Sequence, residues 1–120
     1  MIDYHRKKGS DAQPFRYTVE NYSDGTVPNL TGASVAFVAT MFGQSTPKMN
    51  GAGTITGTGA AGDPWIFAYA PSSGDVDTVG YYNCEWLITY ANGKKERWPC
   101  ANEDTGVPEY LVLVIVQSLS

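Results

Sequence analysis

The sequence is poor in the residues from which metal sites and many active sites are built. It has two cysteines and one histidine, His5, among 120 residues, and none of them stands in a C-x-x-C or H-x-x-x-H spacing that would preorganise a metal site. The nucleophile pattern G-x-S-x-G and the phosphate-binding pattern G-x-x-x-x-G-K-[ST] are also missing. The sequence therefore predicts no enzyme, no cofactor and no metal.

Charge is also scarce, and positive charge most of all. Asp, Glu, Lys and Arg make up 17% of the residues, below the roughly 25% of ordinary soluble domains. Eight basic residues against twelve acidic ones give a net charge of −4, the wrong sign for a protein that neutralises phosphates. Such a low charge is typical of a subunit inside an assembly, and we therefore expect protein partners or further copies of the chain. Because of the negative net charge, we expect no nucleic acid partner.

Long hydrophobic runs are missing as well. Charged residues at positions 3, 6, 7 and 8 leave no room for the apolar region of a signal peptide near the N-terminus. The apolar run Tyr110–Val116 is far shorter than the roughly 20 residues of a membrane-spanning helix. We therefore expect a protein that stays in the cytoplasm where it is made and has no membrane partner.

Turn residues and β-forming side chains are abundant. The chain has thirteen glycines and seven prolines, and 12% of its residues are aromatic. Aromatic and β-branched side chains suit the pleated surface of a sheet, and a chain of 120 residues can bury one sizeable core. The prediction is a single all-β domain over residues 1–120.

Alternation of apolar and polar residues predicts four strands in the first part of the chain. They lie around residues 15–19, 34–42, 54–56 and 65–70. The last of the four is expected to lie next to the strand in residues 80–99. The remainder of the glycine-rich segment 43–63 is predicted to be mostly loop. The inward positions are expected to be Phe15, Tyr17, Val19, Val35, Phe37, Met41, Trp65, Phe67 and Tyr69.

Residues 80–99, GYYNCEWLITYANGKKERWP, carry the strongest pattern. Asn92 and Gly93 are suited to the two positive φ angles of a type I′ turn, which predicts a hairpin with a return strand at 95–99. A last strand at 109–117 is apolar at nearly every position and is predicted to be covered on both faces. The inward side of the first strand is expected to hold Tyr82, Cys84, Trp86, Ile88 and Tyr90.

Tyr82 stands two residues before a cysteine, as does the tyrosine of the corner in immunoglobulin-type domains, whose hydroxyl bonds back to upstream backbone. We assign structural roles to Tyr82, to Trp86 and to the turn residues Asn92 and Gly93. No cysteine precedes Cys84, so the disulfide that joins the two sheets of antibody domains cannot form.

Cys84 and Cys100 are the remaining possible pair. A two-residue hairpin loop places them on opposite faces of the sheet, too far apart for a disulfide. A bulge near Pro99 would bring them to the same face, but the expected cytoplasmic location also disfavours the bond. Two buried thiols are the prediction.

The last strand is also the candidate interface. One face of a strand that is apolar on both sides fills the core, and the other face needs a cover such as a neighbouring subunit. The candidate interface residues are Tyr110, Leu111, Val112, Leu113, Val114, Ile115 and Val116.

Turn and core residues along most of the chain form a series that resembles the N-terminal domain of baseplate upper proteins of tailed bacteriophages and related phage tail proteins. The segments that carry it are Tyr4–Asp11, Pro14–Tyr17, Asp24–Val27, Leu30–Phe37, Asp77–Tyr82 and Tyr90–Pro99. The resemblance implies an immunoglobulin-like β-sandwich of about seven to eight antiparallel strands with no catalytic residues. Ser10 departs from it, since an aspartate of a Gly-Asp turn is expected there.

We therefore expect a bacteriophage or prophage virion structural protein. It would be a tail, baseplate, connector or decoration subunit, located in the virion and, during assembly, in the host cytoplasm, with other virion proteins as partners. The alternative is a module that binds carbohydrate or the host surface through aromatic rings that stack on sugars. The candidate rings are those of Trp65, Tyr81, Trp86 and Trp98.

Overall fold

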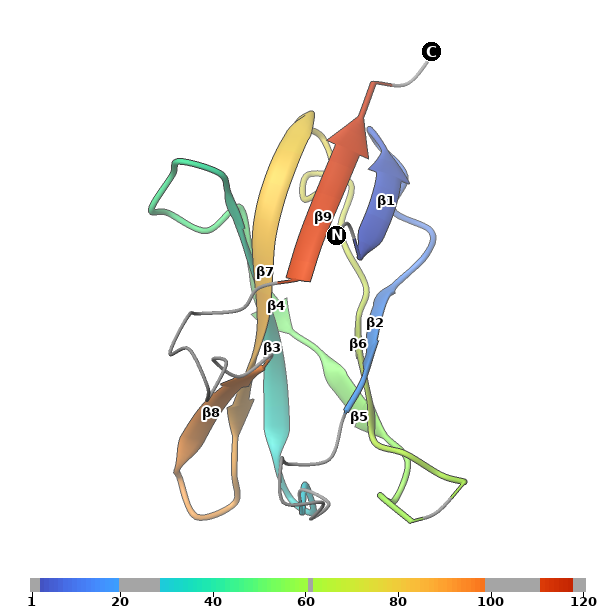
Figure 1. The fold of residues 1–120 in the computed structure, drawn as a ribbon, viewed down its shortest axis with the longest axis vertical. Helices are drawn as coiled ribbons and strands as arrows, with labels where there is room; N and C mark the ends of the chain where they lie inside the picture. Colours follow the sequence, from blue (N-terminus) through green and yellow to red (C-terminus); the bar gives the residue numbers. More distant parts are fainter. Residues whose placement is uncertain (1–2, 20–28, 61, 99–110, 118–120) are drawn as a thin grey trace, which may run out of the picture.

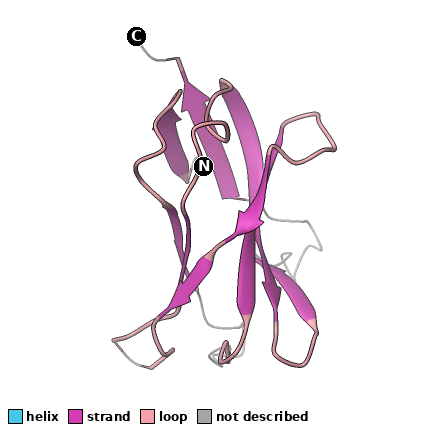
Figure 2. Ribbon diagram, turned by 180° about the vertical axis from the view of Figure 1, so that it is seen from behind, coloured by secondary structure: helices cyan, strands magenta, loops and turns pink. Residues whose placement is uncertain are grey.

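The computed structural model describes residues 3–19, 29–60, 62–98 and 111–117. In these residues the chain forms β-strands joined by turns and loops, and no helix (Figures 1 and 2). The nine strands are β1 (Tyr4–Lys7), β2 (Phe15–Thr18), β3 (Ser34–Met41), β4 (Met49–Ala52), β5 (Thr54–Thr56), β6 (Ile66–Tyr69), β7 (Gly80–Thr89), β8 (Lys95–Trp98) and β9 (Leu111–Val116). The prediction of an all-β chain is confirmed. No helix able to cross a membrane is found among the described residues.

The strands form two sheets. The larger sheet has the order β1-β9-β7-β3-β4, with β8 also paired to β7, and the smaller sheet has the order β2-β6-β5. Strand β1 runs parallel to β9, so the large sheet is mixed, and the prediction of antiparallel strands throughout is wrong for this pair. A parallel pair needs a long connection, and here almost the whole chain lies between the two strands.

Strand β7 is the central strand of the large sheet (Figure 1). One side pairs along its length with β3, while the other side pairs first with β9 and then with β8. Cys84 faces Leu111, and Trp86 faces Trp98. Strands β8 and β9 therefore occupy one strand position in succession.

The structure corrects one prediction about the middle of the chain and adds a strand there. Strand β6 pairs with β2 and β5 and not with β7, because the segment 70–79 carries the chain from the small sheet to the large one. The glycine-rich segment contains β4 as well as the expected β5. Gly53 joins these two strands, and a Cβ atom there would lie 2.7 Å from the carbonyl oxygen of Ala68, so only glycine lets the chain pass between the sheets so closely.

The turn after β7 differs from the predicted type. Gly93 has a φ of +85°, but no described residue other than glycine has a positive φ, which excludes a type I′ turn at Asn92-Gly93. The N–H of Gly93 donates to the carbonyl of Tyr90, and the N–H of Tyr90 donates to the carbonyl of Lys94. This is a type I turn followed by a left-handed glycine, and its extra loop residue shifts the strand register by one position.

The hydrophobic core lies between the two sheets, and the predicted alternation is confirmed. Aromatic rings from both sheets meet around Phe37, whose centroid lies 5.1 Å from that of Phe15 and 5.3 Å from that of Tyr69. The Tyr4 hydroxyl donates to the carbonyl of Arg16 at 2.8 Å and so ties β1 to β2. Completely buried side chains include Phe15, Phe37, Phe67, Tyr82, Cys84, Trp86 and Ile88, while Tyr17, Met41, Trp65 and Tyr90 are partly buried against them.

Candidate functional surface

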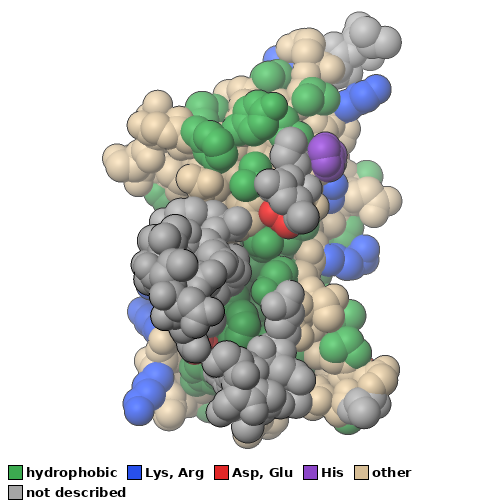
Figure 3. Space-filling model, viewed as in Figure 1, with side chains coloured by type: hydrophobic (Ala, Val, Ile, Leu, Met, Phe, Trp, Pro, Cys, Tyr) green, Lys and Arg blue, Asp and Glu red, His purple; other side chains and the backbone are tan. Residues whose placement is uncertain are grey.

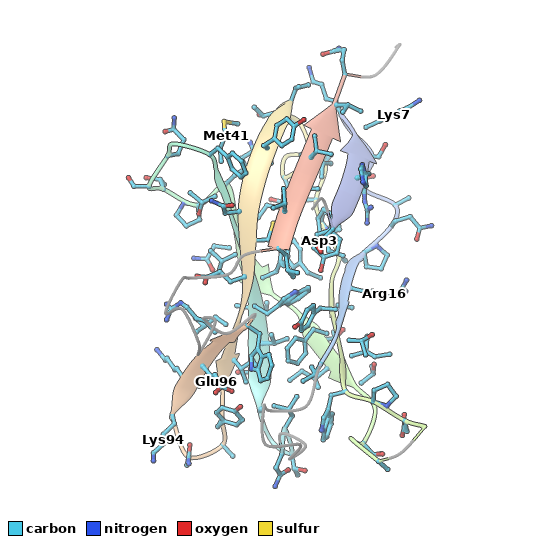
Figure 4. All side chains as sticks on the ribbon, viewed as in Figure 1. Asp3, Lys7, Arg16, Met41, Lys94 and Glu96 are labelled. Atoms are coloured by element: carbon cyan, nitrogen blue, oxygen red, sulfur yellow. The ribbon has the colours of Figure 1, made fainter. Side chains whose placement is uncertain are left out.

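The outer face of the large sheet carries an exposed apolar patch where β7 begins and β3 ends. Its members are Phe42, Val79, Tyr81 and Val116, which are 49%, 45%, 50% and 44% exposed. Figure 3 shows hydrophobic side chains gathered over the upper parts of β7 and β9. The patch lies at the end of the sheet that Met41 and Lys7 mark in Figure 4, and Lys94 marks the opposite end.

Pairing across the sheet brings the patch together. The N–H of Phe42 donates to the carbonyl of Tyr81 at 2.9 Å, and the two ring centroids are 5.9 Å apart. Tyr81 faces Val114 on β9, and Val114 faces His5 on β1. These side chains therefore form one row across the outer face, because residues that face each other in a sheet project to the same side.

The predicted interface strand is only partly available to a partner. Leu113 and Ile115 are completely buried in the core of their own chain, and Val114 is buried on the outer face. The burial of Leu113 and Ile115 agrees with the expectation that one face of this strand fills the core, and the burial of Val114 leaves little of the other face exposed, while an interface through β9 stays a prediction. Leu111 and Val112 are half-buried. Val116 is exposed, and Tyr110 lies outside the described residues.

A shallow polar groove lies on the same face as Phe42 and Tyr81. Its lining begins two positions from these residues, at Thr40 on β3 and Asn83 on β7. It has a volume of about 270 Å³ and is lined by Val38, Thr40, Gln44, Ser45, Asn83 and Glu85. Amide and hydroxyl groups can donate and accept hydrogen bonds, and a carboxylate accepts them. The groove therefore offers hydrogen-bonding groups on the same face of the sheet as the exposed rings of Phe42 and Tyr81.

Three of the four predicted sugar-stacking rings are buried or half-buried. Trp86 and Trp98 are buried, and Trp65 is half-buried against the core. The indole N–H of Trp98 donates to Glu96 at 3.0 Å. Tyr81 is the exposed one of the four candidates. It precedes the inward Tyr82 in the same strand, so its side chain is expected on the outer face.

The structural roles of the corner tyrosine and the buried cysteine agree with prediction. The Tyr82 hydroxyl donates to the carbonyl of Thr78 at 2.6 Å, which is the back-bond expected of a tyrosine corner. Cys84 is a free, completely buried thiol, and burial raises its pKa to about 12, so it stays protonated near neutral pH. Cys100 and Pro99 lie outside the described residues.

The carboxylates near the crossing between β6 and β7 are engaged in contacts within the chain. Asp75 accepts hydrogen bonds from the Tyr69 hydroxyl at 2.6 Å and from the N–H of Ser72 at 2.9 Å. Asp77 pairs with Lys48 at 2.8 Å, and this contact lowers the pKa of Asp77 and raises that of Lys48. Within the described ranges, no three His, Cys, Asp or Glu side chains gather as metal ligands.

No protein-family model, curated protein or solved structure matches the chain. The apolar patch and the polar groove are thus the features from which a function can be inferred. Both lie on the outer face of the large sheet, and both suit non-covalent binding.

Proposed function

We propose that the chain is an immunoglobulin-like β-sandwich that serves as a structural subunit of a bacteriophage or prophage particle. It would be a tail, baseplate, connector or decoration subunit that contacts other virion proteins through the apolar patch. In the immunoglobulin fold one sheet holds strands A-B-E-D and the other G-F-C, to which variable-type domains add C′. The orders β2-β6-β5 and β9-β7-β3-β4 correspond to B-E-D and G-F-C-C′, which supports this fold.

The observation that carries the proposal is the exposure of four large apolar side chains at neighbouring positions. A contiguous apolar patch with a polar surround is typical of a protein contact surface, whereas single exposed apolar residues are ordinary. Tyr and Phe are enriched at the centres of such interfaces. The low charge of the chain and the resemblance of its turn and core residues to baseplate domains favour a partner within a phage particle.

The test uses particles produced by a strain that carries the gene, with the chain quantified by mass spectrometry after purification. The double variant Tyr81→Ser, Val116→Ser should fold normally but enter particles at least about tenfold less than the wild type, since it removes two exposed contacts. Thr18→Ser, an exposed change on β2 in the other sheet, is the control and should enter particles normally. Absence of the wild-type chain from purified particles would refute the proposal.

The polar groove beside Phe42 and Tyr81 favours a second candidate function, the binding of carbohydrate. An aromatic ring next to Gln44, Asn83 and Glu85 offers both stacking and hydrogen bonds to a sugar. Binding on a glycan array should be lost in Tyr81→Ala and reduced in Asn83→Ala. Trp98→Ala is unsuitable for this test because Trp98 is buried and its loss would destabilise the fold.

A further inference from the structure

The edges of the two sheets differ in charge. Sheets in natural proteins commonly protect their edge strands with charged residues, because an open edge can pair with another chain. Strands β1, β2 and β8 follow this rule, but β4 and β5 contain no charged residue. The charges on the protected strands are Arg6, Lys7, Arg16, Lys95, Glu96 and Arg97.

Strands β4 and β5 form one continuous uncharged edge. Residues 49–56, Met-Asn-Gly-Ala-Gly-Thr-Ile-Thr, contain neither charge nor proline. Strand β4 ends the order of the large sheet and β5 ends that of the small sheet, so no described strand lies on the outer side of either (Figure 1). Lys48, just before β4, is paired with Asp77 at 2.8 Å.

The backbone of β4 directs hydrogen-bonding groups to the open side. Gly53 donates its N–H to the carbonyl of Val35, and Gly51 faces Phe37 in the same ladder. In an antiparallel ladder alternate residues bond to the neighbouring strand, so Asn50 and Ala52 point their N–H and C=O groups away from β3. Both residues are exposed.

We propose that two copies of the chain pair through β4, antiparallel and about a two-fold axis at Gly51. Asn50 of each copy then faces Ala52 of the other, and the N–H and C=O groups of both residues are satisfied across the axis. The two large sheets become one continuous sheet.

Charge favours a second copy as the partner of this edge. In a symmetric pair each strand meets itself, so β1 or β2 would bring like charges together, whereas β4 brings none. Copies with a net charge of −4 approach each other most easily through an uncharged surface. A groove beside β4 extends that surface, and its lining residues Ser34, Ala36, Asn50, Ala52, Leu87 and Thr89 are all uncharged.

Sedimentation velocity of the full chain from micromolar to hundred-micromolar concentration tests the pairing. The wild type should form a dimer. Asn50→Lys, Ala52→Lys and Asn50→Glu, Ala52→Glu, each as a double variant, place like charges opposite each other twice and should raise the dimer Kd by about tenfold or more. An equimolar mixture of the two variants should pair again, which also shows that both are folded.

Two controls separate this pairing from the proposed function. Thr18→Lys puts the same charge on the β2 edge and should leave the dimer intact. The patch variant Tyr81→Ser, Val116→Ser should also dimerise normally, because these residues lie outside β4. A wild type that stays monomeric, a dimer that survives both β4 double variants, or a mixture that does not pair would overturn the proposal, and so would dissociation caused by the patch variant.

Discussion

Phe37 and Trp86 face each other across β3 and β7, with their ring centroids 4.7 Å apart. The contact lies on the longest pairing in the large sheet and joins it to the rings of the small sheet. The same two strands position Phe42 and Tyr81 on the outer surface. The aromatic core and the apolar patch therefore depend on one strand pair.

Phe37→Leu should lower the free energy of unfolding by about 1 to 2 kcal/mol, because it removes ring contacts and leaves space in a packed core. Phe42→Leu makes the same change at an exposed position and should alter stability by no more than about 0.5 kcal/mol. Urea unfolding followed by tryptophan fluorescence measures both. Equal losses in the two variants would contradict the assigned core.

Tyr82→Phe should cost about 1 to 2 kcal/mol, because the carbonyl of Thr78 loses its partner in a partly buried site. Tyr81→Phe is the matched control, since the neighbouring ring is half-exposed, and it should change stability little. The measurement is the shift in the urea midpoint. A Tyr82→Phe midpoint equal to that of the wild type would show that the corner bond does not contribute.

Gly53→Ala should destabilise the fold by about 2 to 3 kcal/mol, because the new Cβ would lie 2.7 Å from backbone at Ala68. Gly74→Ala is the control, since the nearest atom to a Cβ there is the Ser72 Oγ at 4.0 Å. Thermal unfolding compares the two. Unchanged stability of Gly53→Ala would mean that β4 and β5 can separate without loss.

Stability should fall as the pH rises from about 10 to 12. Burial, and then the hydrogen bond to Asp75, raise the pKa of Tyr69 from 10.0 to about 12 in the folded chain. A raised folded-state pKa gives a contribution that is complete below pH 10 and is lost between the two values, because the unfolded chain ionises first. Tyr69→Phe should make this decline less steep in unfolding curves recorded across that range, and an unchanged slope would contradict the assignment.

Cys84 should resist thiol reagents in the folded chain. In a Cys100→Ser variant the remaining thiol is buried and protonated, so its modification at pH 8 should occur only as fast as the protein unfolds. Addition of urea should accelerate the reaction sharply. Rapid labelling under native conditions would show that the interior of the chain opens without unfolding.

The sequence predicts the inward residues well because side-chain alternation depends on local geometry alone. Phe15, Phe37 and Trp86 are buried as their parity requires. The turn at Asn92-Gly93 is wrongly predicted because this dipeptide fits two loop lengths, and the choice between them depends on the register of the flanking strands. Strand β4 is missed because Met-Asn-Gly-Ala has no clear alternation and gains its structure from pairing with β3.

The candidate surface is predicted only in part. Tyr81 follows from parity, but Phe42 joins it because the chain continues past the end of β3 with its backbone still bonded to Tyr81. The apolar run predicts that both faces of β9 are covered, and the burial of Val114 on one face and of Leu113 and Ile115 on the other agrees with this. The run does not indicate that Val116, at the end of the strand, is exposed.

Strands β8 and β9 pair in succession with the same side of β7, and this division affects which parts of the sequence can change independently. Strands β8 and β9 are each aligned with β7 by their own set of paired residues, so the register of one does not fix the register of the other. Substitutions within β8 should therefore leave the alignment of β9 on β7 untouched. The two halves of this strand position can change independently while β7 holds both of them in place.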